Sequence, residues 1–483
     1  MRSALALLLL ASCASPSAGT AESGPALEMS AEELEDRIRG GLLGEIFGNL
    51  NGLPHEMKYI AEPGAVERYT PSLPDGAWTD DDTDIEWVYL AEIQKTGTLC
   101  VPPARIAELW RANMNTGIWC ANLYARQLLD LGVDPPLCGR IAINPWSVFN
   151  ISAQFVCESF GLISPGMPQT AARVGIHYTH FAVDGEPIQT TQLFTAMIAT
   201  AYVEKDMEKI VRAGLAAVDP KSAIHPIVTD VLAWWKEHPK DWRETRRRIK
   251  EKYTHHGGGM SDKNGYELNT AAVIGALLHG GGDDLREILR LAFNFGWDSD
   301  CNAAICGAIV GVQRGKKWID AQGWVIKDVY KNTCRDQMPK DETITGYGDK
   351  MIAAARANIL ANGGEELAAG GRKIYRIRLE APANVEPLPS PLDRMEELRK
   401  DLLPKIEKDL TGSPKDRARA AYLAICLGEG ERFRKERADD WKSALEELKK
   451  FPKVLRQIYD APRPQGARIQ AAAQAEGLEK PGK

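Results

Sequence analysis

The chain has 483 residues, of which 44% are hydrophobic and 26% are charged, which is typical of a globular protein with one large domain or with two to three domains. The formal net charge of −6 gives no reason to expect a nucleic-acid partner. The basic residues that do cluster, near Arg246–Lys252 and toward the C-terminus, are typical of solvated helix faces.

The N-terminus is typical of an export signal. Arg2 precedes the apolar run Ala4–Ala11, which is too short to span a bilayer as a helix. Leu10-Ala11-Ser12-Cys13 resembles a bacterial lipobox, which predicts an exported protein held at a bacterial membrane, periplasmic or at the cell surface, by a lipid anchor on Cys13 only. A plain secretory signal that is cut near Ala18 or Ala21 is the alternative.

Nine cysteines are present, and none of them form a C-x-x-C pair, which argues against a zinc or redox motif. Export permits disulfides. The sequence does not fix a pairing, and buried free thiols are an equal alternative. The candidates for disulfides are Cys100, Cys120, Cys138 and Cys157.

The first predicted helix begins at a capping box, Ser30-Ala31-Glu32-Glu33. Gly40, Gly44 and Gly48 recur on one face of it, although each glycine costs a helix about 1 kcal/mol relative to alanine. Three glycines on one stripe therefore indicate that another backbone packs closely there. We expect this helix to end at Asn49–Gly52, which places Glu56 on a loop, where functional residues concentrate.

A strongly acidic stretch follows at Trp78–Glu86, with four aspartates within five positions at the start of a helix that should end at Gly97. Acidic side chains are favourable at a helix N-terminus. Four of them exceed what capping requires, and close carboxylates resist joint ionisation. A multivalent cation bound by these aspartates would remove the conflict.

The middle of the chain is predicted to be helical, beginning with one helix over residues 102–130. A loop at Asn144-Pro145-Trp146 and the segment His177–Phe181 carry the candidate substrate-binding residues, although core packing is an alternative role for the histidines and aromatic side chains. We expect His255–Gly259 to be a flexible loop and not a P-loop, because no strand precedes it. The candidate substrate-binding residues are Asn144, Tyr178 and His180.

A second acidic element, Asp298-Ser299-Asp300-Cys301-Asn302, opens a very apolar helix. Ala303, Gly307 and Gly311 form a small-residue stripe on it that suits the first stripe. If the two helices cross, both acidic elements lie at one end of a helical bundle, where facing helices build metal sites. Their oxygen ligands suit Mg²⁺, Mn²⁺ or Ca²⁺, and two such ions could orient a substrate oxygen and activate water.

The predicted fold class is all-α, with a helical core and a small C-terminal helical module. A short strand is expected at Tyr375–Leu379, ahead of a proline-rich linker. The expected divisions are a signal peptide at 1–12, a flexible tether at 13–27, a catalytic domain at 28–363, a linker with the short strand at 364–391, the helical module at 392–460 and a disordered tail at 461–483.

Over about residues 34–360, the sequence resembles the ADP-ribosylglycohydrolase family, of the type that reactivates ADP-ribosylated dinitrogenase reductase. The matching segments are Gly40–Gly48, Asp80-Asp81-Asp82-Thr83, Tyr178-Thr179-His180 and Asp298–Ala304. The resemblance implies an all-α fold with a cleft that holds two Mg²⁺ or Mn²⁺ ions. It also implies hydrolysis of the bond between the ribose C1 of an ADP-ribosyl or related substrate and a protein side chain or small leaving group.

Three positions depart from the family's pattern. Asp80 stands where the family usually has threonine, unless the matching register is Thr79-Asp80-Asp81. Cys301 replaces a threonine, and Glu56 lies later than the family's early glutamate, whereas Glu45 falls where the family often has aspartate and should be structural. The resemblance implies catalytic roles for Glu56, Asp81 and Asp300, and metal ligands at Asp80, Asp81, Asp82, Asp298, Asp300 and Cys301.

Two other functions stay open. One is a catalytically inactive nucleotide- or sugar-binding lipoprotein that retains the metal site, and the other is a cell-surface scaffold in which the cation is structural. Because ADP-ribosylated proteins and NAD are mainly intracellular, an exported protein could instead act on another riboside or glycoside. Resemblance at the level of the fold does not fix the substrate.

Overall fold

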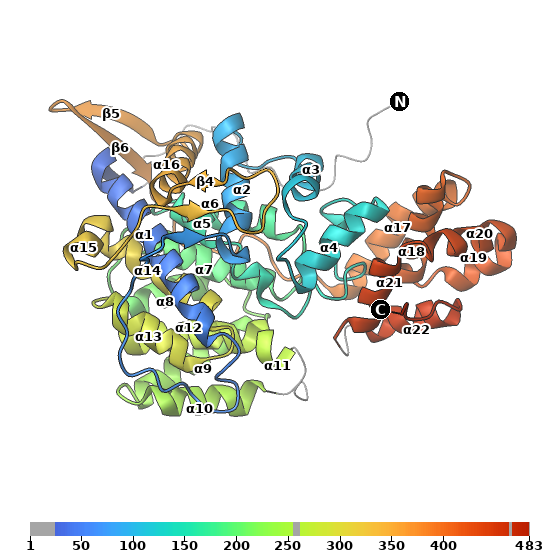
Figure 1. The fold of residues 1–483 in the computed structure, drawn as a ribbon, viewed down its shortest axis with the longest axis horizontal. Coiled ribbons are helices and arrows are strands. Elements are labelled where there is room, and N and C mark those ends of the chain that lie inside the picture. The colour runs from blue at the N-terminus through green and yellow to red at the C-terminus, as the bar shows by residue number, and fades with distance from the viewer. Residues whose placement is uncertain (1–24, 255–260, 463–465, 483) are drawn as a thin grey trace.

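The computed structural model describes residues 25–254, 261–462 and 466–482. The lipobox with Cys13 and the segment His255–Gly259 lie outside these residues. A large helical body contains most of the chain, and a smaller helical module at the C-terminal end packs on one side of it (Figure 1). Over the described ranges, no helix combines the length and apolar character that crossing a membrane requires.

The first part of the large body begins with one long helix, α1 (Ala31–Gly52), whose N-terminus is capped by the Ser30 side chain as predicted. The short 3-10 turn η1 (Leu53–His55) extends it. The helices that follow are α2 (Asp81–Thr96), α3 (Pro103–Asn113), α4 (Cys120–Leu131), the 3-10 turns η2 (Leu137–Gly139) and η3 (Ile151–Ala153), α5 (Glu158–Leu162), α6 (Pro168–Thr179), α7 (Ile188–Thr200) and α8 (Met207–Ala216).

The second part of the large body returns along the first, so that α14 lies beside α1 (Figure 1). Its last helix, α16, packs near the start of the chain, where its Arg356 pairs with Glu35 of α1. The helices are α9 (Ile224–Glu237), α10 (Trp242–Tyr253), α11 (Ser261–Asn264), α12 (Tyr266–Gly280), α13 (Leu285–Phe295), α14 (Ser299–Arg314), α15 (Lys316–Ala321) and α16 (Ile344–Ala361).

The two small-residue stripes meet at the crossing of α1 and α14, which confirms the predicted contact. A Cβ atom added to Gly40 or Gly44 would lie less than 3.0 Å from backbone atoms of Gly311 or Gly307, closer than real Cβ atoms approach. Gly52, at the end of α1, lies against the Cα of Asp300 in the same way. The crossing therefore sets the C-terminal end of α1 against the acidic start of α14.

Three predicted helix boundaries are confirmed and one predicted helix is wrong. α2 begins directly after Asp80 and ends before Gly97, which has the left-handed φ of 70°. α1 ends at Gly52, the last residue of the stretch where its end was expected. The helix expected over 102–130 is two helices, because the turn-forming Asn115-Thr116-Gly117 interrupts it and Gly117 takes a φ of 59°.

Two small three-stranded sheets accompany the helices. β1 (Ala26–Ser30) pairs antiparallel with β6 (Arg372–Arg378), which pairs antiparallel with β5 (Glu365–Ala369). The tether expected at 13–27 and the linker expected at 364–391 therefore both contribute strand residues to this sheet. Tyr375 and Ile377 of β6 are buried in the core. The second sheet joins β2 (Ala77–Trp78), β3 (Tyr330–Lys331) and β4 (Asp341–Glu342). Its strand β2 leads directly into the aspartates of the acidic stretch.

The C-terminal module packs directly on the large body. The Tyr124 and Tyr422 hydroxyls are 2.7 Å apart, and the Trp146 indole N–H donates to the carbonyl of Gln457 at 3.1 Å. The expectation of a disordered tail is wrong for α22, because Ile469 on it is buried. The helices of the module are α17 (Pro391–Asp409), α18 (Pro414–Leu427), α19 (Gly430–Glu436), α20 (Ala438–Leu448), α21 (Pro452–Asp460) and α22 (Ala467–Ala475).

The disulfide candidates do not pair with one another. Cys120, Cys138 and Cys157 are free thiols in the described part of the chain. Cys138 and Cys157 are buried and donate to the backbone carbonyls of Phe181 and Gln154. The alternative of buried free thiols therefore applies to these two residues.

Candidate metal centre

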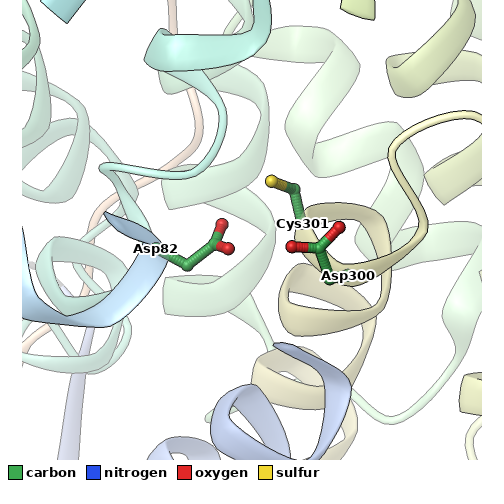
Figure 2. Close-up of side chains that lie close together, drawn as sticks. All are labelled: Asp82, Asp300 and Cys301. Carbon is green, nitrogen blue, oxygen red and sulfur yellow. The ribbon is translucent and has the colours of Figure 1, made fainter. Parts of the chain in front are cut away.

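The N-termini of α2 and α14 face each other beside the C-terminal end of α1. Asp82, on the first turn of α2, points toward Asp300 and Cys301 on the first turn of α14 (Figure 2). Each of these three side chains offers one ligand atom, and the three atoms lie within 4.8 Å of one another. All three side chains are buried.

Two further groups with the same spacing overlap this one. Glu56, Asp298 and Asp300 form one of them, and Asp80, Asp81 and Asp82 form the other. Asp300 and Asp82 are each shared between two groups, so the three groups form a single acidic cluster. This cluster contains every metal ligand and every catalytic residue expected from the sequence: Glu56, Asp80, Asp81, Asp82, Asp298, Asp300 and Cys301.

Glu56 reaches the cluster because the loop after α1 is fastened to the residues that precede α14. The backbone N–H of Met57 donates to the carbonyl of Trp297 at 2.8 Å, and the Ser299 hydroxyl donates to the carbonyl of His55 at 3.3 Å. These bonds hold Glu56 at the exposed edge of the cluster, facing Asp298.

Burial makes the negative charge of the cluster unfavourable. It raises the pKa of the Asp81, Asp82 and Asp300 carboxyls well above the usual range, and neighbouring carboxylates raise it further. The pKa of Glu56 is raised to about 7, first by burial and then by Asp298 and Asp80. A bound cation would compensate this charge.

Several carboxylate oxygens of the cluster also lack a partner. Counting the described residues only, one buried oxygen on each of Asp82, Asp298 and Asp300 accepts no hydrogen bond. Unpartnered buried polar atoms are costly and uncommon in folded proteins. Hard divalent cations take carboxylate oxygens as ligands, so the donor set of the cluster fits Mg²⁺ or Mn²⁺.

Three asparagines that hold the aspartates were not identified from the sequence. Asn49 on α1 donates through its amide to Asp80 at 3.0 Å and to Asp82 at 2.6 Å. Asn269 accepts the backbone N–H of Asp298 at 3.0 Å, and Asn264 donates to the carboxylate of Asp298. The one available signal was the place of Asn49, directly after the glycine stripe.

The fourth aspartate of the acidic stretch has a separate, structural partner. Asp84 forms a fully buried ion pair with Arg335. Burial raises the pKa of Asp84 to about 7 in spite of this arginine, which lowers it. Because Arg335 also donates to the carbonyl of Gly117 at 2.7 Å, the pair ties α2 to the turn between α3 and α4.

The three candidate substrate-binding residues lie outside the ligand groups that the described residues form. Tyr178 donates its hydroxyl to the carbonyl of Leu99 at 2.7 Å. His180 contacts the carboxylate of Glu386 at 2.9 Å. Asn144 is fully buried and donates to three backbone carbonyls. Each of these polar groups therefore has a hydrogen-bond partner within the protein. For Tyr178 and His180 this agrees with the alternative given above, a structural role in the core.

Two exposed tryptophans are close in the sequence to residues of the cluster or to residues near it. Trp78 precedes Asp80 by two residues and is 39% exposed, and Trp119 is 66% exposed. Trp119 is next to Cys120, whose pKa is raised to about 12 by burial first and then by Asp81 and Asp298. The thiol of Cys120 therefore lies close enough to the cluster to sense its charge.

The fold and the acidic cluster together define a mostly helical protein of the ADP-ribosylglycohydrolase class. The model of the ADP-ribosylglycohydrolase family matches residues 30–358, which is more than half of the chain, so the chain belongs to this family. It is also similar to a solved structure described as an "ADP-ribosylglycohydrolase-related protein complex", with 16% identity and a TM-score of 0.43, covering 68% of this chain and 99% of that one. The curated proteins compared with the chain contain no match.

Proposed function

We propose that the protein is a metal-dependent hydrolase that cleaves the N- or O-glycosidic bond at the ribose C1 of an ADP-ribosyl group or a related riboside. The observation that carries the proposal is the acidic cluster, in which three segments distant in the sequence bring six carboxylates and one thiol together. Family membership supports the reaction class. The specific leaving group is not part of the proposal, because the fold alone does not define it.

The residues of the cluster have different roles in the proposed reaction. Asp80, Asp81, Asp82, Asp298 and Asp300 would hold two Mg²⁺ or Mn²⁺ ions, which when bound supply positive charge for the ribose hydroxyls and for a water. Glu56 stands at the exposed edge of the cluster, where it can accept a proton from the water that attacks C1. The Asn49 amide keeps Asp80 and Asp82 in position.

The exposed indoles support a nucleotide substrate. Trp78 is two residues before Asp80 and Trp119 is next to Cys120, and their exposed, flat apolar faces are suited to an adenine ring or a sugar. Apolar surface that is exposed to water is unfavourable, so a ligand that covers the indole gains free energy from the surface that it buries.

The test is a calorimetric titration of ADP-ribose into protein loaded with Mg²⁺ and into protein stripped with EDTA. We expect binding that requires the metal and that is lost in Asp300→Ala, with turnover of an ADP-ribosylated protein or small molecule to free ADP-ribose. Metal binding without any binding of ADP-ribose would contradict an ADP-ribosyl substrate and would favour extracellular glycosides.

A second candidate function is binding without turnover. Cys301 stands where the family has threonine, and Asp80 does so as well unless the matching register is Thr79-Asp80-Asp81, so the centre departs from the family's pattern. Binding of metal and ADP-ribose with no product, even at high protein concentration, would favour this function over hydrolysis.

We also propose that the protein is exported and held at a bacterial membrane through a lipid on Cys13. The support is the sequence Leu10-Ala11-Ser12-Cys13. Labelled fatty acid should be incorporated into the expressed protein and lost in Cys13→Ser. Incorporation that persists in this variant would contradict the anchor.

A further inference from the structure

We propose that one position of the metal centre selects a thiophilic divalent ion, of the class of Zn²⁺, Co²⁺ or Fe²⁺, through the sulfur of Cys301. The position is bounded by Asp82, Asp300 and Cys301, and the adjacent one, bounded by Glu56, Asp298 and Asp300, is all oxygen. The centre would then hold two different ions. This inference rests on the proposed function in one respect: both require that the cluster binds divalent cations.

The geometry of the three donors suits a small ion. Zinc binds sulfur at about 2.3 Å and carboxylate oxygen at about 2.0–2.2 Å in tetrahedral geometry, so two of its ligands lie about 3.5 Å apart. The three ligand atoms lie within 4.8 Å of one another without a metal. Side-chain shifts of up to about 1 Å would close them around one tetrahedral ion.

The three donors point at the same space (Figure 2), and the Asn49 amide takes up only one oxygen of Asp82. Asp82 and Asp300 are 1% and 4% exposed, and each has one carboxylate oxygen without a hydrogen-bond partner among the described residues. Cys301 is 6% exposed, and its sulfur lies on the side of the cluster that faces Asp82 (Figure 2). Two orphaned buried oxygens beside a buried sulfur indicate a ligand that all three share.

The sulfur distinguishes this position from its neighbour. A thiolate is a poor ligand for Mg²⁺ and a good one for zinc and its first-row neighbours, whereas three carboxylates suit Mg²⁺, Mn²⁺ or Ca²⁺. Cys301 lies in the first turn of α14, which places its sulfur within 4.8 Å of the ligand oxygens of Asp82 and Asp300. On binding, the thiol gives its proton to solvent and the sulfur takes the metal in its place, so the electron count is unchanged.

Cys120 provides a matched control. It is also a free thiol close to the cluster, since Asp81 and Asp298 raise its pKa, but it belongs to none of the ligand groups found among the described residues. Its replacement by serine should leave the metal–sulfur bond intact.

The experiment is an optical titration of the EDTA-stripped full chain with Co²⁺. Wild type and Cys120→Ser should develop a sulfur-to-cobalt charge-transfer band in the near ultraviolet at one equivalent of metal. Cys301→Ser and Cys301→Thr should lack that band but still bind Co²⁺ through oxygen, as the visible ligand-field bands would report. Competition with Zn²⁺ should show an affinity at least about tenfold weaker in the two Cys301 variants, since even outer partners of a metal ligand contribute this much.

The outcomes separate the two proposals. A Co²⁺ complex of the wild type without the charge-transfer band, or a band that persists in Cys301→Ser, overturns the sulfur ligand and leaves the hydrolase proposal standing if ADP-ribose still binds. No binding of Co²⁺, Zn²⁺ or Mg²⁺ by folded wild type overturns both. Thermal unfolding of the two Cys301 variants shows whether they fold, and Cys301→Thr keeps the test valid if the serine variant does not.

Discussion

Gly48 of α1 lies so close to Ala303 of α14 that a Cβ on the glycine would be less than 3.0 Å from the alanine carbonyl. One turn further along α1 and one turn back along α14, Gly52 touches the backbone of Asp300. Asn49, directly after Gly48, holds Asp80 and Asp82. The close crossing of these two helices is therefore also the device that brings the two acidic elements together.

Replacing the central glycine of the crossing should damage both stability and the metal centre. In Gly44→Ala the added Cβ meets the backbone of Gly307, which cannot move without separating α1 from α14. Overpacking of this kind costs about 1–3 kcal/mol. Urea unfolding should show this loss, and Mg²⁺ affinity should fall with it.

The control for this substitution is Gly482→Ala, where an added Cβ meets no described atom within 4 Å. It should leave both measurements unchanged. A Gly44→Ala protein with wild-type stability and wild-type Mg²⁺ affinity would show that the crossing does not set the geometry of the cluster.

Removing the Asn49 amide should weaken metal binding without removing any ligand. The amide fixes one oxygen of Asp80 and one of Asp82, and loss of such a supporting partner typically costs about 10–100-fold in metal affinity. Calorimetric titration with Mn²⁺ should show this loss in Asn49→Ala. Asn51→Ala is the matched control, because Asn51 binds Ser72 and Tyr69; equal losses in both variants would refute a role for Asn49 in the centre.

Local rules predicted the parts of the centre that are local in the sequence. The aspartates before α2 and α14, the glycine that ends α2 and the spacing of the two small-residue stripes all act within one or two helical turns. The pairing of the stripes was also predictable, because closely packed backbones need small residues on both helices. These features were sufficient to bring the two acidic elements together, whereas the roles of Glu56 and Cys301 followed from the family resemblance.

The features that sequence reasoning missed depend on contacts between distant segments. Nothing near Asn49 indicates that Asp80 and Asp82 will lie beside it, and Cys120 is close to Asp298 only in the folded chain. α22 lies in the tail at 461–483 that was expected to be disordered, yet its Ile469 is buried. Tyr178 was assigned to substrate by its motif, whereas its hydroxyl bonds to Leu99.

A second group of buried carboxyls should make stability depend on pH. Glu45, Glu86 and Glu158 are 0–1% exposed, and burial raises the pKa of each, that of Glu158 to about 8. The charge of Glu158 raises the pKa of Glu45 and Glu86 further. Between about pH 4.5, where this carboxyl ionises in the unfolded chain, and pH 8, the folded state binds more protons than the unfolded state. The free energy of unfolding should therefore fall as the pH rises through this range.

Glu158→Gln should remove the contribution of this carboxyl. Between pH 6 and pH 9, the free energy of unfolding measured in urea should fall less in the variant than in wild type. The difference between the two proteins should be a few kcal/mol, since each unit of pKa shift corresponds to about 1.4 kcal/mol. Glu431→Gln, at a fully exposed position, is the control. An unchanged pH dependence in Glu158→Gln would mean that Glu158 is ionised in the folded protein.

Trp119→Ala should weaken ADP-ribose binding and leave metal binding intact. The indole is 66% exposed and is next to Cys120, and stacking of a base on an aromatic side chain is worth about 1–3 kcal/mol, so an affinity loss of about tenfold is expected. Calorimetry with ADP-ribose and with ribose 5-phosphate should show the loss only for the ligand that carries adenine. Val325→Ala, at a similarly exposed apolar residue, should bind both as wild type does. Equal losses for the two ligands would place Trp119 at the sugar, and no loss for either would remove it from the binding site.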